Sequence, residues 1–375
     1  MLSRSEGVLS ERGALDLLRF PLAIVVMQEH LWPHISTFGV SEYTWLQRFF
    51  QGFVCEYSVP VYLFLAGYFF FANIGPLDRP TYAGKVRRRL RTLVVPYFAW
   101  NTIAIAVKIV TAVCLMHLFG QTAYRMDLSL SAANLLNCYG YYDGSLIGTR
   151  LPDPTVPINA ALWFLRNLMV VVLCTPIWYH LLKNKERGKV VLLFFMGLFL
   201  ATRAWKLEGV VRDTVYQYLF TVAFFSWGAY LGIHRIDPAV HFRPWFKRVS
   251  LLYLGFGSLM AWLMFSHLPL GLTLKGVGMI AAVPLACLLA DGAYRSGSRT
   301  TPEQVACGVF IYVSHLILLN IMEKLAYALS PHTEAGLLVG WMGVALVSAA
   351  LLTGTFRLLR RYAPRLLRLL IGSNG

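Results

Sequence analysis

The chain has 375 residues, of which 57% are hydrophobic and 14% charged, and its mean hydropathy is +0.57. This composition excludes an ordinary soluble domain, in which about 45–50% of residues are apolar and about 25% are charged. The formal net charge of +16 would suit a nucleic-acid-binding protein, but the distribution of the basic residues argues against that class.

Apolar runs of about 17 to 25 residues recur along the chain, which is the length a helix needs to cross a bilayer. We place ten of them, at 14–34, 48–72, 93–118, 161–182, 190–206, 214–233, 249–267, 271–290, 304–328 and 335–356. No small-residue cleavage site follows the first run, so we expect it to persist as a helix rather than to be removed as a signal. The pattern predicts an all-α, polytopic membrane bundle of about ten transmembrane helices, forming a single domain over residues 1–375.

Basic residues gather in alternate connections between these runs. The basic connections contain Arg4 and Arg12, Arg79 to Arg91, Lys183 to Lys189, Arg235 to Arg248, Arg295 and Arg299, and Arg357 to Arg368. By the positive-inside rule, connections of this kind face the cytoplasm. Both termini are then cytoplasmic, with residues 357–375 as a basic tail, and we expect membrane lipid and no nucleic acid among the partners.

The longest connection, 119–160, is rich in Tyr, Asn, Gly and Pro and less basic than the others. The alternation places it outside the cytoplasm, as a long extracytoplasmic loop. Connections of this length often have a function of their own. Its aromatic and amide side chains suit a sugar-binding face, and a plain tether is the alternative.

Two ionisable residues interrupt the first apolar run, Arg19 and His30. At about 100° per residue, the eleven-residue step between them returns to within about 20° of the same helix face, with a rise of about 16 Å. Ionisable groups in hydrocarbon are costly and usually face a bundle interior or a wet cavity, where they mark a pathway or a reaction site. We therefore expect this helix to line an active site. An ion pair between Arg19 and Asp16, one turn earlier, is the structural alternative for the arginine.

Four further residues are candidates for a supporting role near this helix. Glu29 is adjacent to His30 but points about 100° away from it, and Glu56 enters the second run at a comparable depth. Arg166 stands near the start of the fourth run, and His315 lies in the middle of the ninth. For both of these, a hydrogen bond that only holds helices together is the alternative.

Neither the cysteines nor the histidines show the spacing of a metal site. The six cysteines include no CxxC pair and fall mostly within apolar runs, as small core residues do. A disulfide between Cys55 and Cys138 is left open, because a sequence does not give the distance between them. We predict no metal and no permanently bound cofactor.

Several segments resemble one family along nearly the whole chain. They are LDLLRFPLAIVVMQEH, which holds an arginine followed after ten residues by a histidine, and then SVPVYLFLAGYFFF, KVRRRLRTLVVPYFAWN, ALWFLRNLMV, FFSWGAYLGI and FIYVSHLILL. In these segments the chain is similar to acyltransferase family 3. It departs from the family at Glu29, where an apolar residue is more common, and at Ala66, where a serine often precedes Gly67.

The resemblance implies transfer of an acyl group, commonly acetyl from acetyl-CoA, onto a hydroxyl of a surface or secreted carbohydrate, in the inner membrane of a bacterium. The partners are then an acyl-CoA donor and a glycan acceptor. His30 becomes the general base, because an imidazole accepts a proton near neutral pH. Arg19 becomes the residue that contacts the donor or orients a polar network.

Within the same resemblance, the basic residues entering the third run would bind the CoA phosphates. They are Lys85, Arg87, Arg88, Arg89 and Arg91. Helical spacing sends them in different directions, so we expect a subset to bind. Arg166 could contact the acceptor or the acyl oxygen, and His315 could complete the site.

Two other functions fit some of these features. A transporter or flippase of a glycan or lipid-linked sugar would also have about ten helices, charged cavity residues and a basic inner face. A non-catalytic assembly subunit would tolerate substitution of Arg19 and His30 apart from effects on stability. Direct attack on the thioester and a transient acyl group on His30 both remain open, as do the acceptor and the oligomeric state.

Overall fold

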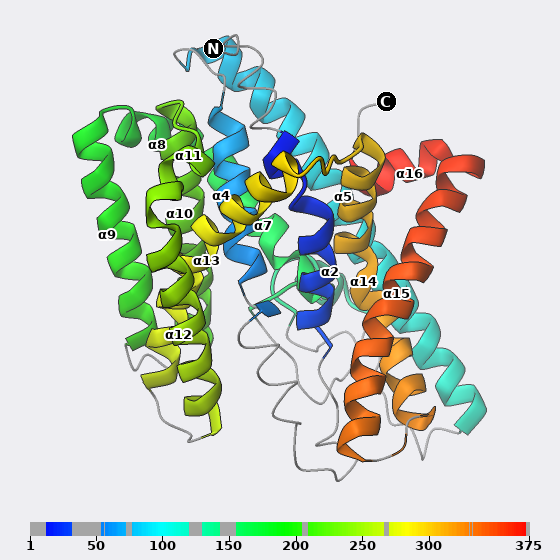
Figure 1. The fold of residues 1–375 in the computed structure, drawn as a ribbon. Coiled ribbons are helices and arrows are strands. Elements are labelled where there is room, and N and C mark those ends of the chain that lie inside the picture. Colours follow the sequence, from blue (N-terminus) through cyan, green and yellow to red (C-terminus); the bar gives the residue numbers. More distant parts are fainter. Residues whose placement is uncertain are drawn as a thin grey trace.

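The structure is a computed structural model that describes residues 13–31, 54–55, 57–72, 77–119, 130–142, 155–204, 209–265, 270–329, 331 and 333–372. Within these ranges all regular structure is helical. The long helices run roughly side by side between two ends of the molecule (Figure 1). The predicted all-α bundle is therefore confirmed for the described part of the chain.

The longer helices have the following bounds. They are α2 Arg19–Glu29, α4 Ser58–Phe71, α5 Arg79–Phe119, α7 Trp163–Leu173, α8 Thr175–Leu182, α9 Lys185–Ala204, α10 Gly209–Ile233, α12 Phe246–Phe265, α13 Leu270–Arg295, α14 Pro302–Leu329, α15 Glu334–Tyr362 and α16 Pro364–Ile371. Short elements are α6 Ala132–Asn137, η3 Ala160–Leu162, α11 Pro238–Phe242 and η4 Arg243–Trp245. Each of the ten predicted runs overlaps one of the longer helices.

Four of these helices are long and apolar enough to cross a membrane. They contain the spans Arg79–Cys114, Lys275–Arg295, Pro302–Ala326 and Leu338–Tyr362. A fifth is added if α7 and α8, which meet at a bend of 63°, are counted as one. Pro176 lies in the first turn of α8, where its ring and missing N–H prevent continuation of α7. A total of about ten spans stays a prediction, as does the side of the membrane that each terminus faces.

The predicted alternation of basic connections agrees with the arrangement of the helices. The turn between α8 and α9, the short α11 and the C-terminal α16 all lie at the same end of the bundle, the upper end in Figure 1. We call this end the basic end.

The predicted basic tail is not a free tail over its described length. Residues 357–362 are the last turns of α15, and 364–371 form α16. The leucines and arginines of α16 have helical spacing, so one face of the helix is buried. That face consists of Leu367, Leu370 and Ile371. The Trp100 indole N–H of α5 donates a hydrogen bond of 2.9 Å to the Leu370 carbonyl. Sequence composition alone did not predict this docking.

The centre of the bundle is held by close packing of α4 against α10. A Cβ atom on Gly67 would lie 2.0 Å from the carbonyl oxygen of Phe225, and one on Gly228 would lie 1.9 Å from that of Phe64. The two backbones therefore touch at these glycines. Small residues let membrane helices approach closely, and dispersion contacts then replace the hydrophobic drive that lipid does not supply.

Candidate active site

A cavity of about 370 Å³ opens between helices α2, α4, α5, α7 and α14 and the end of α16. Its walls are mostly apolar, with two arginines and two tyrosines among them. The lining includes Arg19, Tyr62, Ala66, Phe69, Arg89, Thr92, Pro96, Phe164, Leu168, Ala306, Gly308, Tyr312, Val313, Ile371 and Gly372. An apolar cavity with a few polar groups is the usual form of a small-molecule site.

Arg19 lines this cavity from the first residue of α2. Its guanidinium forms an ion pair with Asp16 at 2.8 Å and lies over the ring of Phe69, 4.7 Å from the centroid. The backbone carbonyl of Arg19 accepts a hydrogen bond from the hydroxyl of Tyr62. The predicted ion pair thus exists, and it does not remove the arginine from the cavity.

Of the five basic residues proposed to bind phosphate, Arg89 is the one that lines the cavity. Arg87, Arg88 and Arg91 are exposed on other faces of α5. Lys85 donates a hydrogen bond of 2.5 Å to the carbonyl of Phe70, at the end of α4. Helical spacing thus divides the run among several faces of α5, and the cavity carries two guanidinium groups from two helices. Binding of phosphate by a subset of the run stays a prediction.

The part of the cavity wall that lies farthest toward the C-terminal end of α14 is aromatic. The Tyr62 ring centroid lies 6.2 Å from those of both Phe164 and Tyr312. Tyr312 donates a hydrogen bond of 2.5 Å to the carbonyl of Ala161, which ties α14 to η3. Sequence reasoning missed both tyrosines, although Tyr312 is three residues before His315 and so shares its helix face.

Beyond Tyr312 lies a pair of imidazoles. The ring centroids of His30 and His315 are 5.2 Å apart, and that of Tyr312 is 6.2 Å from His315. Helices α2 and α14 pack together and run side by side (Figure 1), so that Arg19 and Gly308 meet at the cavity while His30 and His315 meet farther along. The prediction that Arg19 and His30 share a face of α2 is consistent with this geometry.

His315 is fully buried, and its Nδ1 lies 3.2 Å from the carbonyl oxygen of Ile311. A carbonyl accepts only, so Nδ1 carries the proton and Nε2 is left as an acceptor. Nε2 is buried and makes no hydrogen bond within the described residues. The pair therefore holds at least one buried basic nitrogen that the surrounding helices do not satisfy.

Glu29 interacts with α13, and not with α14, the helix that carries His315. Its charge is close to that of Lys275 on α13 and to the thiol of Cys55. Glu29 is thus placed to pair with Lys275, a half-buried lysine that sequence reasoning did not select. Glu56, the other carboxylate proposed near His30, lies outside the described residues.

Arg166 is buried and held by four hydrogen bonds. Its acceptors are the carbonyls of Gly140 and Thr155 and the side-chain oxygens of Asn167 and Gln217, at 2.8 to 3.2 Å. These bonds fasten the segment before α7 to α10. The structural alternative for Arg166 thus has direct support in the contacts, while a role toward substrate stays a prediction.

A pair of buried amides, Asn101 and Asn159, lies beside α14 at the start of η3. The Asn159 amide nitrogen donates to the carbonyl of Val313 at 3.1 Å, and its backbone N–H donates to Asn101 Oδ1 at 3.2 Å. The Oδ1 atom of Asn159 has no partner in the described part of the chain. Sequence reasoning did not select these two asparagines. The only feature of the sequence that pointed to either of them is that Asn101 ends the segment KVRRRLRTLVVPYFAWN, which resembles the family.

No metal site is visible within the described ranges, where no group of three His, Cys, Asp or Glu side chains could hold an ion. Cys55 and Cys138 are both free thiols and both buried. The disulfide between them, which the sequence left open, is therefore not formed in this structure.

Comparison with known proteins identifies a family for the chain. A family model described as an acyltransferase domain matches residues 12–360, a range that contains Arg19, Arg89, His30 and His315. The α16 wall of the cavity lies beyond the matched range. No curated protein and no solved structure matches the chain. Because the match covers nearly the whole chain, and the chain folds into apolar helices of membrane-spanning length, it belongs to acyltransferase family 3 and is a membrane acyltransferase.

Proposed function

We propose that the protein is an O-acyltransferase that moves acetyl, or another acyl group, from acyl-CoA to a hydroxyl of a surface or secreted carbohydrate. The observation that carries this proposal is the line of groups from Arg19 and Arg89, through the cavity, to the His30–His315 pair. The proposed setting is the inner membrane of a bacterium, with the basic end in the cytoplasm, where acyl-CoA is present.

The donor enters the cavity from the basic end. Arg19 and Arg89 are placed to bind phosphate oxygens, since guanidinium groups offer paired donors that match a phosphate. The apolar walls then accept the extended thioester arm. The thioester points toward Tyr312 and, beyond it, toward the imidazoles of His315 on α14 and His30 at the end of α2.

In the proposed reaction, His30 takes the proton of the acceptor hydroxyl as the hydroxyl oxygen attacks the thioester carbonyl carbon. The tetrahedral intermediate collapses with cleavage of the carbon–sulfur bond. The thiolate of CoA leaves and receives a proton from the His30 imidazolium. The products are an ester of the carbohydrate and free CoA, so the enzyme returns to its starting state. General base catalysis of this kind typically contributes about 10²- to 10⁴-fold.

His315 serves as a positioning residue for His30 in this scheme. Its Nδ1–H is held by the Ile311 carbonyl at 3.2 Å, so its ring has a fixed orientation against the ring of His30. A second route, in which the acyl group passes first to an imidazole nitrogen of His30, uses the same atoms. The two routes differ in whether an acyl-enzyme accumulates when the acceptor is withheld.

The test uses the full chain in lipid nanodiscs with acetyl-CoA labelled in the acetyl group. Release of CoA thiol and label bound to glycan are measured together, with glycans taken from cells that lack the gene. His30→Ala should abolish both signals, whereas His241→Ala, an exposed histidine on α11, should leave them unchanged. Equal transfer by a folded His30→Ala protein would overturn the proposal. In sealed proteoliposomes, movement of glycan across the bilayer without release of CoA would support a transporter instead.

A further inference from the structure

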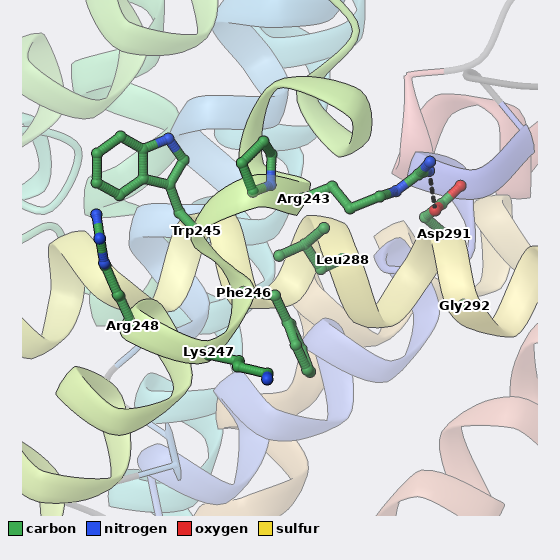
Figure 2. A pocket seen from close by; sticks show the side chains of 9 residues that line it. Arg243, Trp245, Phe246, Lys247, Arg248, Leu288, Asp291 and Gly292 are labelled. Atoms are coloured by element: carbon green, nitrogen blue, oxygen red, sulfur yellow. Dashed lines mark hydrogen bonds and ion pairs between the residues drawn. The ribbon is translucent and has the colours of Figure 1, made fainter.

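A second hollow opens at the basic end, away from the cavity described above. It has a volume of about 670 Å³ and lies between η4, the start of α12 and the last turns of α13 (Figure 2). Its lining combines basic and aromatic side chains, namely Arg243, Trp245, Phe246, Lys247 and Arg248, with Leu288 and Asp291. None of these residues lines the cavity that contains Arg19.

The charges in this hollow are unevenly paired. Asp291 forms ion pairs with Arg243 at 3.1 Å and with Arg295 at 3.0 Å, and Figure 2 shows Arg243 extended toward it. Lys247 and Arg248 are exposed and have no carboxylate partner within the described residues. The hollow therefore presents a net positive charge to whatever enters it.

The aromatic residues indicate where the hollow lies relative to a bilayer. Trp245 and Phe246 are 51% and 46% exposed, and the guanidinium of Arg248 lies over the Trp245 ring at 5.1 Å (Figure 2). Tryptophan beside basic residues is typical of the headgroup level of a membrane. The exposed Trp245 beside Arg248 is thus the combination of side chains expected where a protein meets lipid headgroups.

An apolar groove continues from the same arginine. It has a volume of about 550 Å³ and runs along α12, lined by Arg248, Leu251, Leu252, Gly255, Phe256 and Leu259. A Cβ atom on Gly255 would meet no atom within 4 Å, so the groove is open at that point. Arg248 lines both spaces, so it joins the basic hollow to the open apolar groove along α12.

We propose that these two spaces form one binding site for an anionic phospholipid. Lys247 and Arg248 bind the phosphate, which prefers paired and charged donors. One acyl chain lies in the groove over Gly255. A basic pocket between membrane helices on the positively charged side is a known way to hold an anionic headgroup. The apolar groove distinguishes a lipid from a free phosphate, because only a lipid has a chain to fill it.

The test measures lipids that remain on the full-length protein after purification from nanodiscs that contain equal amounts of phosphatidylglycerol and phosphatidylcholine. Native mass spectrometry counts the bound lipid of each kind. The wild type should retain phosphatidylglycerol in preference. The double variant Lys247→Gln with Arg248→Gln should lose that preference by roughly 25-fold, since each of the two basic side chains near an anionic surface contributes about a factor of five.

Two matched controls separate a local site from general charge and from misfolding. Lys183→Gln with Lys185→Gln removes the same charge from exposed positions at the same end, and it should keep the preference. Gly255→Leu should displace lipid by filling the groove, whereas Gly197→Leu, at another open glycine on α9, should not. Size-exclusion profiles and thermal midpoints show that each variant is folded.

Three results would overturn the proposal. One is equal retention of the two lipids by the wild type. Another is an equal loss of preference in both double charge variants. The third is competition of inorganic phosphate with lipid in the wild type, combined with a Gly255→Leu variant that binds phosphate and retains lipid as the wild type does. That result would show a phosphate site only, with no acyl chain in the groove.

Discussion

His30 of α2 and His315 of α14 face each other with their ring centroids 5.2 Å apart, although they lie near opposite ends of the chain. The contact occurs one helical turn beyond Tyr312, which lines the cavity that also holds Arg19 and Arg89. The imidazole pair therefore lies beyond the Tyr312 wall of that cavity, while the guanidinium groups line the cavity itself. This separation is what a donor with a charged end and a reactive end requires.

Replacing His30 by Ala should lower kcat for acyl transfer by about 10²- to 10⁴-fold, because a general base is removed. The measurement is the rate of labelled acetyl transfer to glycan at saturating acetyl-CoA. Binding of the donor should change little, since Arg19 and Arg89 remain. A variant that loses donor binding to the same extent as turnover would show that His30 has a structural role instead.

His315→Asn should lower kcat by a smaller factor, about tenfold, with an unchanged KM for acetyl-CoA. Asparagine keeps a donor near the Ile311 carbonyl but removes the ring that packs against His30. The informative readout is kcat per folded molecule, because a general loss of folded protein would lower the apparent rate but leave the activity of each folded molecule unchanged. Active-site titration with a slowly turned-over thioester gives the folded fraction.

Arg89→Gln should raise the KM for acyl-CoA by about ten- to a hundredfold, because a hydrogen bond to a charged group contributes about 1.5–3 kcal/mol. Arg88→Gln is the matched control, since that neighbour is exposed on another face of α5 and does not line the cavity. Initial rates over a range of donor concentrations compare the two. Equal effects from both variants would mean that the whole basic run acts through its field and not through one contact.

Removal of α16 should weaken use of the donor while leaving the bundle folded. Ile371 and Gly372 form part of the cavity wall, and α16 is attached to α5 through Leu370 and Trp100. A chain that ends at residue 363 should show a KM for acyl-CoA raised by roughly an order of magnitude, because apolar wall and enclosure are lost. Arg365→Gln, on the exposed face of α16, should retain the wild-type KM. An unchanged KM in the shortened chain would place the donor away from this wall.

Gly228→Ala should lower the thermal midpoint strongly, because its methyl group would lie 1.9 Å from the Phe64 carbonyl oxygen and force α10 away from α4. Overpacking of this kind typically costs about 1–3 kcal/mol, and more where backbone must move. Gly197→Ala on α9 meets no atom within 4 Å and serves as the control. Scanning fluorimetry in detergent measures both. A midpoint for Gly228→Ala equal to that of the control would contradict the close approach of these helices.

Much of the fold was predictable because helix periodicity is local. Apolar runs located the long helices, and the eleven-residue step from Arg19 to His30 placed both on one face, since 3.6 residues per turn is a property of the backbone alone. The presence of basic residues in alternate connections likewise anticipated that they share one end of the bundle. The position of Pro176 also indicates the bend between α7 and α8, and the spacing of the leucines indicates the helical α16. The predicted runs and the predicted tail did not take these two signals into account.

The partners of each side chain were decided by tertiary structure. Sequence composition could not say that Arg89, and not Arg88, turns toward the cavity, that Arg166 is held by four acceptors, or that His30 meets His315. Between apolar helices in lipid, hydrophobicity does not favour one pairing over another, so contacts depend on shape, such as the glycine approach of α4 and α10. The sequence by itself determined which residues are chemically able to act and which faces they occupy, while close packing of distant segments decided which of them meet.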